Sequence, residues 1–282
     1  MTLLLGAVAY DPKVVTIWDG FRVWLREHDL DFDYVLYSNY ERQVEELIDG
    51  RVGVAWNSPL AWVRARRLAA ARSVELQAIT MRDTDCDLTS VIVTRGDAGL
   101  NSVEDLRGRT IATGAVDSPQ ATLIPLQVLR RSGLEPGKDV TLQRFDVGVG
   151  LHGDHIGGER DAARALAAGQ VDAACMIDGN LLLFGQEGIL APDVHVLART
   201  GPYDHCTMTA GPGASAQELA RFGELLLGMS YADPEVRVLL DLEGLKQWVA
   251  PRLHGFAQLE EAVDVTGFYS QAGEIGAGDY RP

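Results

Sequence analysis

Apolar segments of strand length alternate with segments of helical periodicity along most of this 282-residue chain. The first pair is a continuous apolar run at residues 2–10, followed by residues 15–30, in which Ile17, Phe21 and Leu25 fall on one helical face. Two parallel strands need a crossover connection, and a helix of this length supplies one. The repeated order of strand and helix therefore predicts an α/β protein with mostly parallel strands and helices on both faces of the sheet.

The same pattern continues to residue 269. Strands are expected at residues 31–39, 52–57, 74–80, 88–95, 110–115, 140–147, 171–178 and 194–200. Helices are expected at residues 40–50, 58–72, 102–108, 118–133, 158–169, 215–229, 233–244 and 255–269. Residues 272–282 are expected to form a loose tail.

The charge of the chain limits its partners. The formal net charge is −15. A surface that binds nucleic-acid phosphates or anionic lipids needs a basic face, so no nucleic acid and no membrane surface is expected as a partner. No window approaches the roughly 20 apolar residues of a membrane-spanning helix, so membrane insertion is not expected either.

The first residues and the cysteines predict the compartment. The amino terminus lacks the basic start and the apolar run of about 7–15 residues that mark a secretory signal. Cys86, Cys175 and Cys206 form an odd set without a CxxC pair, which suits a reducing compartment. We therefore expect a cytoplasmic protein, or a periplasmic or extracellular one if a signal sequence has been removed.

Three stretches carry a resemblance to a known family. They are "GVAWNSPLA" at residues 53–61, "DLRGRTIATGAVDSPQATLIPLQVL" at residues 105–129 and "ERDAARALAAGQVDAACMID" at residues 159–178. Together with the order of the elements, they resemble the type 2 periplasmic binding protein fold. Within that fold, the chain is similar to the phosphate/phosphonate substrate-binding proteins of ABC transporters over about residues 3–269.

This resemblance implies an α/β fold of two lobes, each a mixed sheet flanked by helices, with a ligand cleft between them. Lobe one is expected to comprise residues 1–91 and 203–282, and lobe two residues 92–202. The crossings between them are expected at residues 90–95 and 197–204. The implied function is the binding of a small polar, anionic ligand in the cleft, with an ABC permease as a partner only if the chain is exported.

Ligands of such folds contact the carboxyl ends of strands and the amino termini of helices. The candidate ligand-binding residues at these places are Tyr10, Trp56, Asn57, Ser58, Ser118, Gln120 and Thr122. The resemblance makes Ser118 the leading candidate, because phosphonate-binding relatives use hydroxyl and amide groups there for the anionic head group. The alternative role of Tyr10 is a lid over the core, and that of Ser58 is a helix cap.

Residues 150–159 contain two histidines and a glutamate ahead of a predicted helix. The resemblance implies that this loop points into the cleft, toward residues 204–206. Three interpretations stay open, since loops often carry sites. The first is direct ligand contact, by His152, His155, Asp178 and His205, or by Asp154 and Glu159 with an amine. The second is a divalent metal such as zinc, held by His152, His155, Glu159 and His205. The third is a loop whose histidines only hydrogen-bond to the backbone; no other cofactor is expected.

The alternative function is an enzyme on the same fold, of lyase or hydrolase type and metal-assisted, with His155, Glu159 and Cys206 as candidate catalytic residues. Cys206 follows His205 directly, but adjacent side chains on an extended segment point to opposite sides, which weighs against a thiol activated by that histidine. Cys175 lies in an apolar strand and is expected in the core. Acidic neighbours are expected to raise the pKa of the Cys86 thiol.

Overall fold

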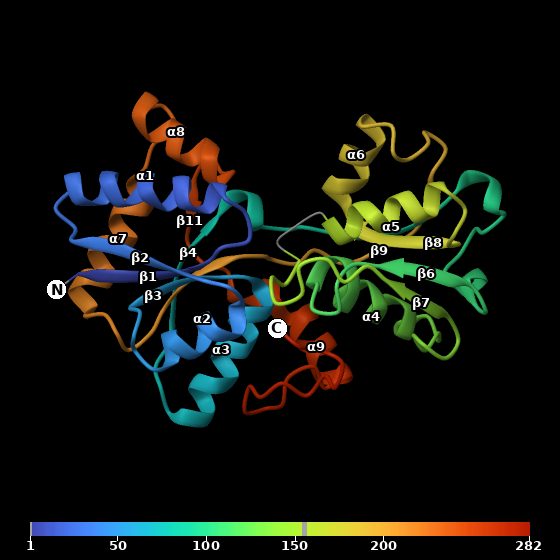
Figure 1. Ribbon diagram of the computed structural model, residues 1–282, viewed down its shortest axis with the longest axis horizontal. Coiled ribbons are helices and arrows are strands. Elements are labelled where there is room, and N and C mark those ends of the chain that lie inside the picture. Colours follow the sequence, from blue (N-terminus) through green and yellow to red (C-terminus); the bar gives the residue numbers. More distant parts are fainter. Residues whose placement is uncertain (1, 154–156) are drawn as a thin grey trace.

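The computed structural model describes residues 2–153 and 157–282. Two mixed sheets lie side by side along the long axis of the molecule, each with helices on both faces (Figure 1). The strand order is β11-β4-β10-β3-β1-β2 in the first sheet and β7-β6-β8-β5-β9 in the second. We call the part built around the first sheet the first lobe and the part around the second sheet the second lobe. The predicted fold class is confirmed.

The first lobe combines the beginning and the end of the chain. Strands β1 and β2 pair in parallel, as do β1 and β3, whereas β10 runs antiparallel between β3 and β4. Its strands are β1 (Leu3–Val8), β2 (Phe32–Tyr37), β3 (Val54–Asn57), β4 (Gln77–Arg82), β10 (Thr207–Ala210) and β11 (Trp248–Val249). Its helices are α1 (Lys13–Glu27), α2 (Tyr40–Ile48), α3 (Pro59–Arg72), α7 (Ala216–Gly228), α8 (Pro234–Glu243) and α9 (Ala257–Thr266).

The second lobe comes from the middle of the chain. Strand β6 pairs in parallel with β7 and β8, and β5 runs antiparallel to β8 and β9. Its strands are β5 (Ser90–Thr94), β6 (Thr110–Thr113), β7 (Thr141–Arg144), β8 (Ala173–Ile177) and β9 (His195–Arg199). Its helices are η4 (Pro119–Leu123), α4 (Ile124–Arg131), α5 (Gly157–Ala167) and α6 (Asp178–Gln186).

Each lobe has its own apolar core, and a third cluster is common to both. In the first lobe Phe21 packs edge-on against Trp248, with ring centroids 6.1 Å apart. In the common cluster, Leu60 of α3 and Ile124 of α4 are buried together with Val263 of α9. Burial of apolar surface stabilises a fold in proportion to its area, so this cluster joins the lobes independently of the crossing strands.

The two crossings pair with each other. Leu88 and Tyr203 exchange backbone hydrogen bonds of 2.8 and 2.9 Å, and the Tyr203 hydroxyl lies 2.7 Å from the Ser90 hydroxyl. All of β5, from Ser90 on, lies in the second sheet. The lobe boundaries at residues 91 and 203 stay a prediction.

The expectation that residues 272–282 form a loose tail is wrong. Tyr280 is only 1% exposed and belongs to the common cluster, while Asp279 forms an ion pair with Arg144 of the second lobe. The carboxyl terminus therefore lies between the two sheets, beside α9 (Figure 1). In the part of the chain that the structure describes, no helix is both long enough and apolar enough to cross a membrane.

Candidate functional site

A pocket of 310 Å³ lies between the lobes and has walls from both of them. Strand ends and helix starts form these walls, as the strand-end rule for open sheets predicts. The lining residues are Tyr10, Lys13, Trp56, Arg82, Thr84, Asp85, Leu88, Gln120, Gly153, Glu159, Ile177, Asn180, His205 and Cys206.

Arg82, at the end of β4, organises the wall on the first lobe. Its guanidinium donates two hydrogen bonds to Asp85, of 2.6 Å from Nε and 2.9 Å from Nη2, and lies 5.2 Å from the centroid of the Trp56 ring. A second carboxylate, that of Glu243, lies 3.4 Å from Nη1. Burial raises the pKa of Asp85, but the Arg82 charge and the His205 ring outweigh it and hold that pKa at about 2.

His205 and Cys206 extend this wall and contact each other. The distance from His205 Nδ1 to Cys206 Sγ is 3.1 Å, and that from Nδ1 to Asp85 Oδ1 is 3.5 Å. The expectation that the two adjacent side chains point to opposite sides is wrong. They precede β10, which starts at Thr207, and the His205 backbone N–H donates to the Asp85 carbonyl, so this segment does not follow the alternation of a regular strand.

Glu159, in the first turn of α5, organises the wall on the second lobe. Its Oε2 accepts hydrogen bonds from the Ile177 amide (3.0 Å) and the Asn180 side chain (2.6 Å). Burial raises the pKa of the carboxyl, and these two donors oppose the shift. Glu159 Oε1 and Gln120 Oε1 are buried and accept no hydrogen bond from any described residue. Two acceptor atoms in this wall therefore have no donor among the described residues.

His152 lies elsewhere than predicted. It is fully buried at φ +50°, a left-handed conformation that turns its ring away from the pocket and into the first lobe. There Nδ1 lies 2.7 Å from Ser58 Oγ, Nε2 lies 2.9 Å from Glu41 Oε1, and the ring stacks on Tyr40. His152 is thus a buried contact between the lobes and does not line the pocket.

Some of the other predicted site residues line the pocket, and some do not. Tyr10, Trp56, Gln120, Glu159, His205 and Cys206 line the pocket, whereas Asn57, Ser58, Ser118, Thr122 and Asp178 do not. Ligand contact by either group stays a prediction. Asp154 and His155 lie outside the described residues.

The residues off the pocket wall have other partners. The Ser58 and Ser118 hydroxyls cap α3 and η4, and the Thr122 hydroxyl donates to the Ala115 carbonyl. Asn57 Oδ1 accepts from Gln43, and Asp178 forms an ion pair with Arg199.

The cysteines follow the prediction in part. Cys175 is buried in the core, as expected. The pKa of Cys86 is raised, but burial is the largest cause and the acidic neighbours are lesser ones.

A family model described as "ABC transporter, phosphonate, periplasmic substrate-binding protein" matches residues 7–254. This chain belongs to that family. The predicted resemblance is confirmed, and with it ligand binding as the function of the chain. Members of this family typically need no cofactor.

Solved structures show the same fold for this phosphonate-type substrate-binding protein. PhnD1 from Prochlorococcus marinus (MIT 9301), in complex with methylphosphonate, is 18% identical with a TM-score of 0.69, and the match covers 95% of this chain and 99% of that one. The aliphatic sulphonate binding protein SsuA from Escherichia coli is 17% identical with a TM-score of 0.59, covering 94% and 91%. An uncharacterized Haemophilus influenzae protein is 27% identical over 106 residues, 38% of this chain and 70% of that one.

Of the pocket residues of this substrate-binding protein that were not predicted, three are charged. They are Lys13, Arg82 and Asp85. The acidic run at residues 83–87, just before the first crossing, is the sequence signal for Asp85, because that run lies at the carboxyl end of a strand. Lys13 carries a comparable signal, since it follows the loop after β1.

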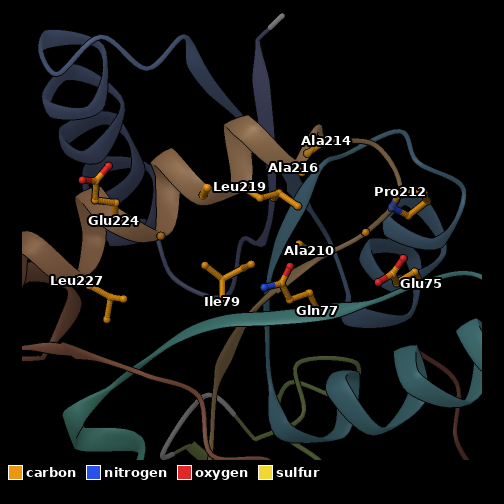
Figure 2. Close-up of a pocket in the computed structure, with 13 residues that line it drawn as sticks. Glu75, Gln77, Ile79, Ala210, Pro212, Ala214, Ala216, Leu219, Glu224 and Leu227 are labelled. Carbon is orange, nitrogen blue, oxygen red and sulfur yellow. The ribbon is translucent and has the colours of Figure 1, made fainter.

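A larger cavity, of 590 Å³, lies on the first lobe alone (Figure 2). Ile79 of β4 and Leu219 of α7 face each other across it, and Glu75 and Glu224 lie at its ends (Figure 2). No second-lobe residue among those described lines it, so this cavity does not lie between the lobes.

Proposed function

We propose that this substrate-binding protein takes a small organic anion, a phosphonate or sulfonate, that also carries an amine. The observation that carries the proposal is the pair of buried acceptors, Glu159 Oε1 and Gln120 Oε1, in the wall of the pocket. A buried acceptor without a donor costs about 1–3 kcal/mol, so a ligand that supplies a donor there is favoured. An ammonium group donates up to three hydrogen bonds and restores the charge balance beside an ionised Glu159.

On the opposite wall, Lys13 favours an anionic group. Lys13 and Arg82 line this wall, together with His205. The positive charge of Arg82 faces the carboxylates of Asp85 and Glu243. Lys13 lies at the start of α1, with its Nζ 5.7 Å from the centroid of the Tyr10 ring. A cation in a partly closed site attracts an anion more strongly than it does in bulk water. The relative PhnD1 binds methylphosphonate, which is an anion of the proposed class.

Trp56 provides a direct signal for binding, because its indole lines the pocket. Tryptophan fluorescence and calorimetry should be recorded with methylphosphonate, ethylphosphonate, 2-aminoethylphosphonate and the matching sulfonates. We expect the aminated compounds to bind at least about tenfold more tightly than their alkyl counterparts, from one charge-assisted hydrogen bond. The proposal would be overturned if the protein bound none of these anions.

The variant Glu159→Gln tests the amine contact. It keeps the shape of the side chain and removes the charge, so the preference for aminated ligands should fall by about 10–100-fold. Affinity for simple alkyl anions should change little. Glu224→Gln is the matched control, because Glu224 is exposed and far from this pocket. An unchanged preference in Glu159→Gln would contradict the amine contact.

The transport partner is also part of the proposal. The family description names a periplasmic substrate-binding protein of an ABC transporter, which supports this part of the proposal. An ABC permease of the phosphonate type is therefore the proposed partner, and transport in vesicles that contain such a permease tests it.

The enzyme alternative has one supporting contact, that between His205 and Cys206. A relay needs the two ring nitrogens of histidine to serve different partners, one the nucleophile and the other the orienting carboxylate. Here Cys206 and Asp85 both lie nearest to Nδ1. This geometry favours binding over nucleophilic catalysis.

A further inference from the structure

We propose that Asp85, His205 and Cys206 bind one zinc-type divalent ion in the wall of the pocket. The three side chains offer a carboxylate oxygen, an imidazole nitrogen and a sulfur that all lie within 4.8 Å of one another. This set of donor types is one that zinc prefers over magnesium or calcium. The proposal is independent of which organic ligand the pocket takes.

The distances between the donor atoms fit a tetrahedral ion. Ligands at 2.0–2.3 Å from zinc lie roughly 3.3–3.7 Å from one another in a tetrahedron. His205 Nδ1 lies 3.1 Å from Cys206 Sγ and 3.5 Å from Asp85 Oδ1. These two distances lie within a few tenths of an ångström of that range, and every pair of the three donor atoms lies within 4.8 Å.

Neighbouring groups hold the three donors in place. Asp85 and Cys206 are each 2% exposed, and His205 is 8% exposed. Arg82 fixes the Asp85 carboxylate through two hydrogen bonds, and the His205 backbone N–H donates to the Asp85 carbonyl at 2.8 Å. Groups that orient the ligands in this way are typical of metal sites and raise their affinity.

The local charge also favours a cation. Arg82 faces two buried carboxylates, Asp85 and Glu243, so these three groups carry one net negative charge. Binding of a divalent ion by the Cys206 thiolate, with the thiol proton released to solvent, brings the cluster to neutrality. Lys13 also lines the pocket and adds a second positive charge to that of Arg82.

The arrangement resembles an open metal site. Three protein ligands leave the fourth tetrahedral position for water or solute. All three donors line the 310 Å³ pocket, so that fourth position faces the space where a ligand enters.

The test is a metal titration of the full chain after removal of metal with a chelator. Cobalt(II) bound by a thiolate gives a sulfur-to-cobalt charge-transfer band, which zinc then abolishes by displacement. We expect one equivalent of either ion. Cys206→Ala should abolish the band and weaken binding by more than about 100-fold, since even the loss of a group that only orients a ligand costs 10–100-fold.

Two further variants keep the result interpretable. Cys175→Ala is the matched control, because Cys175 is buried in β8 of the other lobe and should leave the titration unchanged. His205→Gln should weaken binding even if Cys206→Ala fails to fold. Absence of the band in the wild type, or equal affinity in His205→Gln, overturns the proposal.

Glu159→Gln separates this site from the amine contact. It should leave metal affinity unchanged while it alters the preference for aminated ligands. Loss of metal binding in Glu159→Gln would place the ion on the other wall of the pocket and contradict the assignment to Asp85, His205 and Cys206.

Discussion

The imidazole Nδ1 of His152 lies 2.7 Å from the hydroxyl oxygen of Ser58, although 94 residues separate them in the chain. Ser58 starts α3 of the first lobe, and His152 belongs to the loop between β7 and α5 of the second. The other ring nitrogen contacts Glu41 of α2 at 2.9 Å and lies near the hydroxyls of Tyr269 and Tyr280. One buried side chain therefore connects both lobes and the carboxyl-terminal segment.

Replacement of this histidine should destabilise the whole molecule. In His152→Ala the buried Glu41 carboxylate loses its hydrogen bond with His152 and keeps the one from Tyr269, and the loss of a hydrogen bond to a buried charged group costs about 1.5–3 kcal/mol. Urea denaturation followed by circular dichroism measures the loss. His195→Ala is the control, because His195 is exposed and should change stability by less than about 0.5 kcal/mol. A loss below 1 kcal/mol in His152→Ala would show that the contact between the lobes is weak.

Glu41 predicts a loss of stability in acid. Burial is the largest single influence and raises its pKa, but His152 and the Tyr269 and Tyr280 hydroxyls together outweigh burial and lower the pKa from 4.5 to about 2. A carboxylate with a depressed pKa stabilises the fold above pH 4.5, and this contribution is lost as the pH falls from 4.5 to 2. The contribution is about 3 kcal/mol.

The variant Glu41→Gln should lack this contribution. Asp117 faces the same imidazole, and burial raises its pKa, so it acts in the opposite direction. The difference in unfolding free energy between wild type and Glu41→Gln, measured from pH 7 to pH 2.5, removes the Asp117 contribution. This difference should shrink on acidification, and a constant difference would exclude the depressed pKa.

Ser118→Ala should lower stability without lowering ligand affinity. The hydroxyl accepts a hydrogen bond of 3.1 Å from the Ala121 N–H at the start of η4, and it does not line the pocket. Loss of such a cap costs about 1 kcal/mol. Ser215→Ala, which removes the cap of α7, gives the cost of a cap on an exposed helix. A tenfold loss of phosphonate affinity in Ser118→Ala would restore this serine as a ligand residue.

Gly153→Ala should weaken ligand binding. A Cβ at this position would lie 2.5 Å from Ser118 Oγ and 2.7 Å from Gln120 Nε2, so the Gln120 side chain must move. Because Gln120 Oε1 is one of the two acceptors without a described donor, affinity for an aminated ligand should fall by about tenfold, the equivalent of one hydrogen bond.

Gly137→Ala is the matched control for this substitution. Gly137 has a similar backbone angle, φ +79° against +72°, but an added Cβ there meets nothing within 4 Å. Both variants carry the conformational cost of a left-handed residue, and only Gly153→Ala displaces Gln120. Equal ligand affinity in the two variants would contradict the role of Gln120.

The sequence predicted most of the fold, because hydrophobic periodicity marks segments that are locally regular. It missed β10, in which threonines alternate with Met208 and Ala210 so that no continuous apolar run marks the strand, and α6, whose apolar residues Leu181, Leu182 and Leu183 lie on all sides. The tail was mistaken because its glycines suggested disorder, while one aromatic residue, Tyr280, anchors it in the core.

The candidate site was predicted less completely. The rule that ligands lie at strand ends and helix starts located Trp56 and needs only local information, whereas the family resemblance located Glu159. The direction of His152 depends on a single left-handed residue, and the contact of Asp85 with His205 joins positions 120 residues apart. Neither a rare backbone angle nor a distant pairing leaves a periodic signal in the sequence.

The position of β10 has a consequence for synthesis of the chain. All five strands of the second sheet lie between residues 90 and 199, whereas the first sheet has β10 between β3 and β4. On the ribosome, β3 and β4 therefore emerge long before the strand that separates them. Domains fold as units once their residues are available, so the second lobe can fold first. The half of the protein that begins the chain is the half that is completed last.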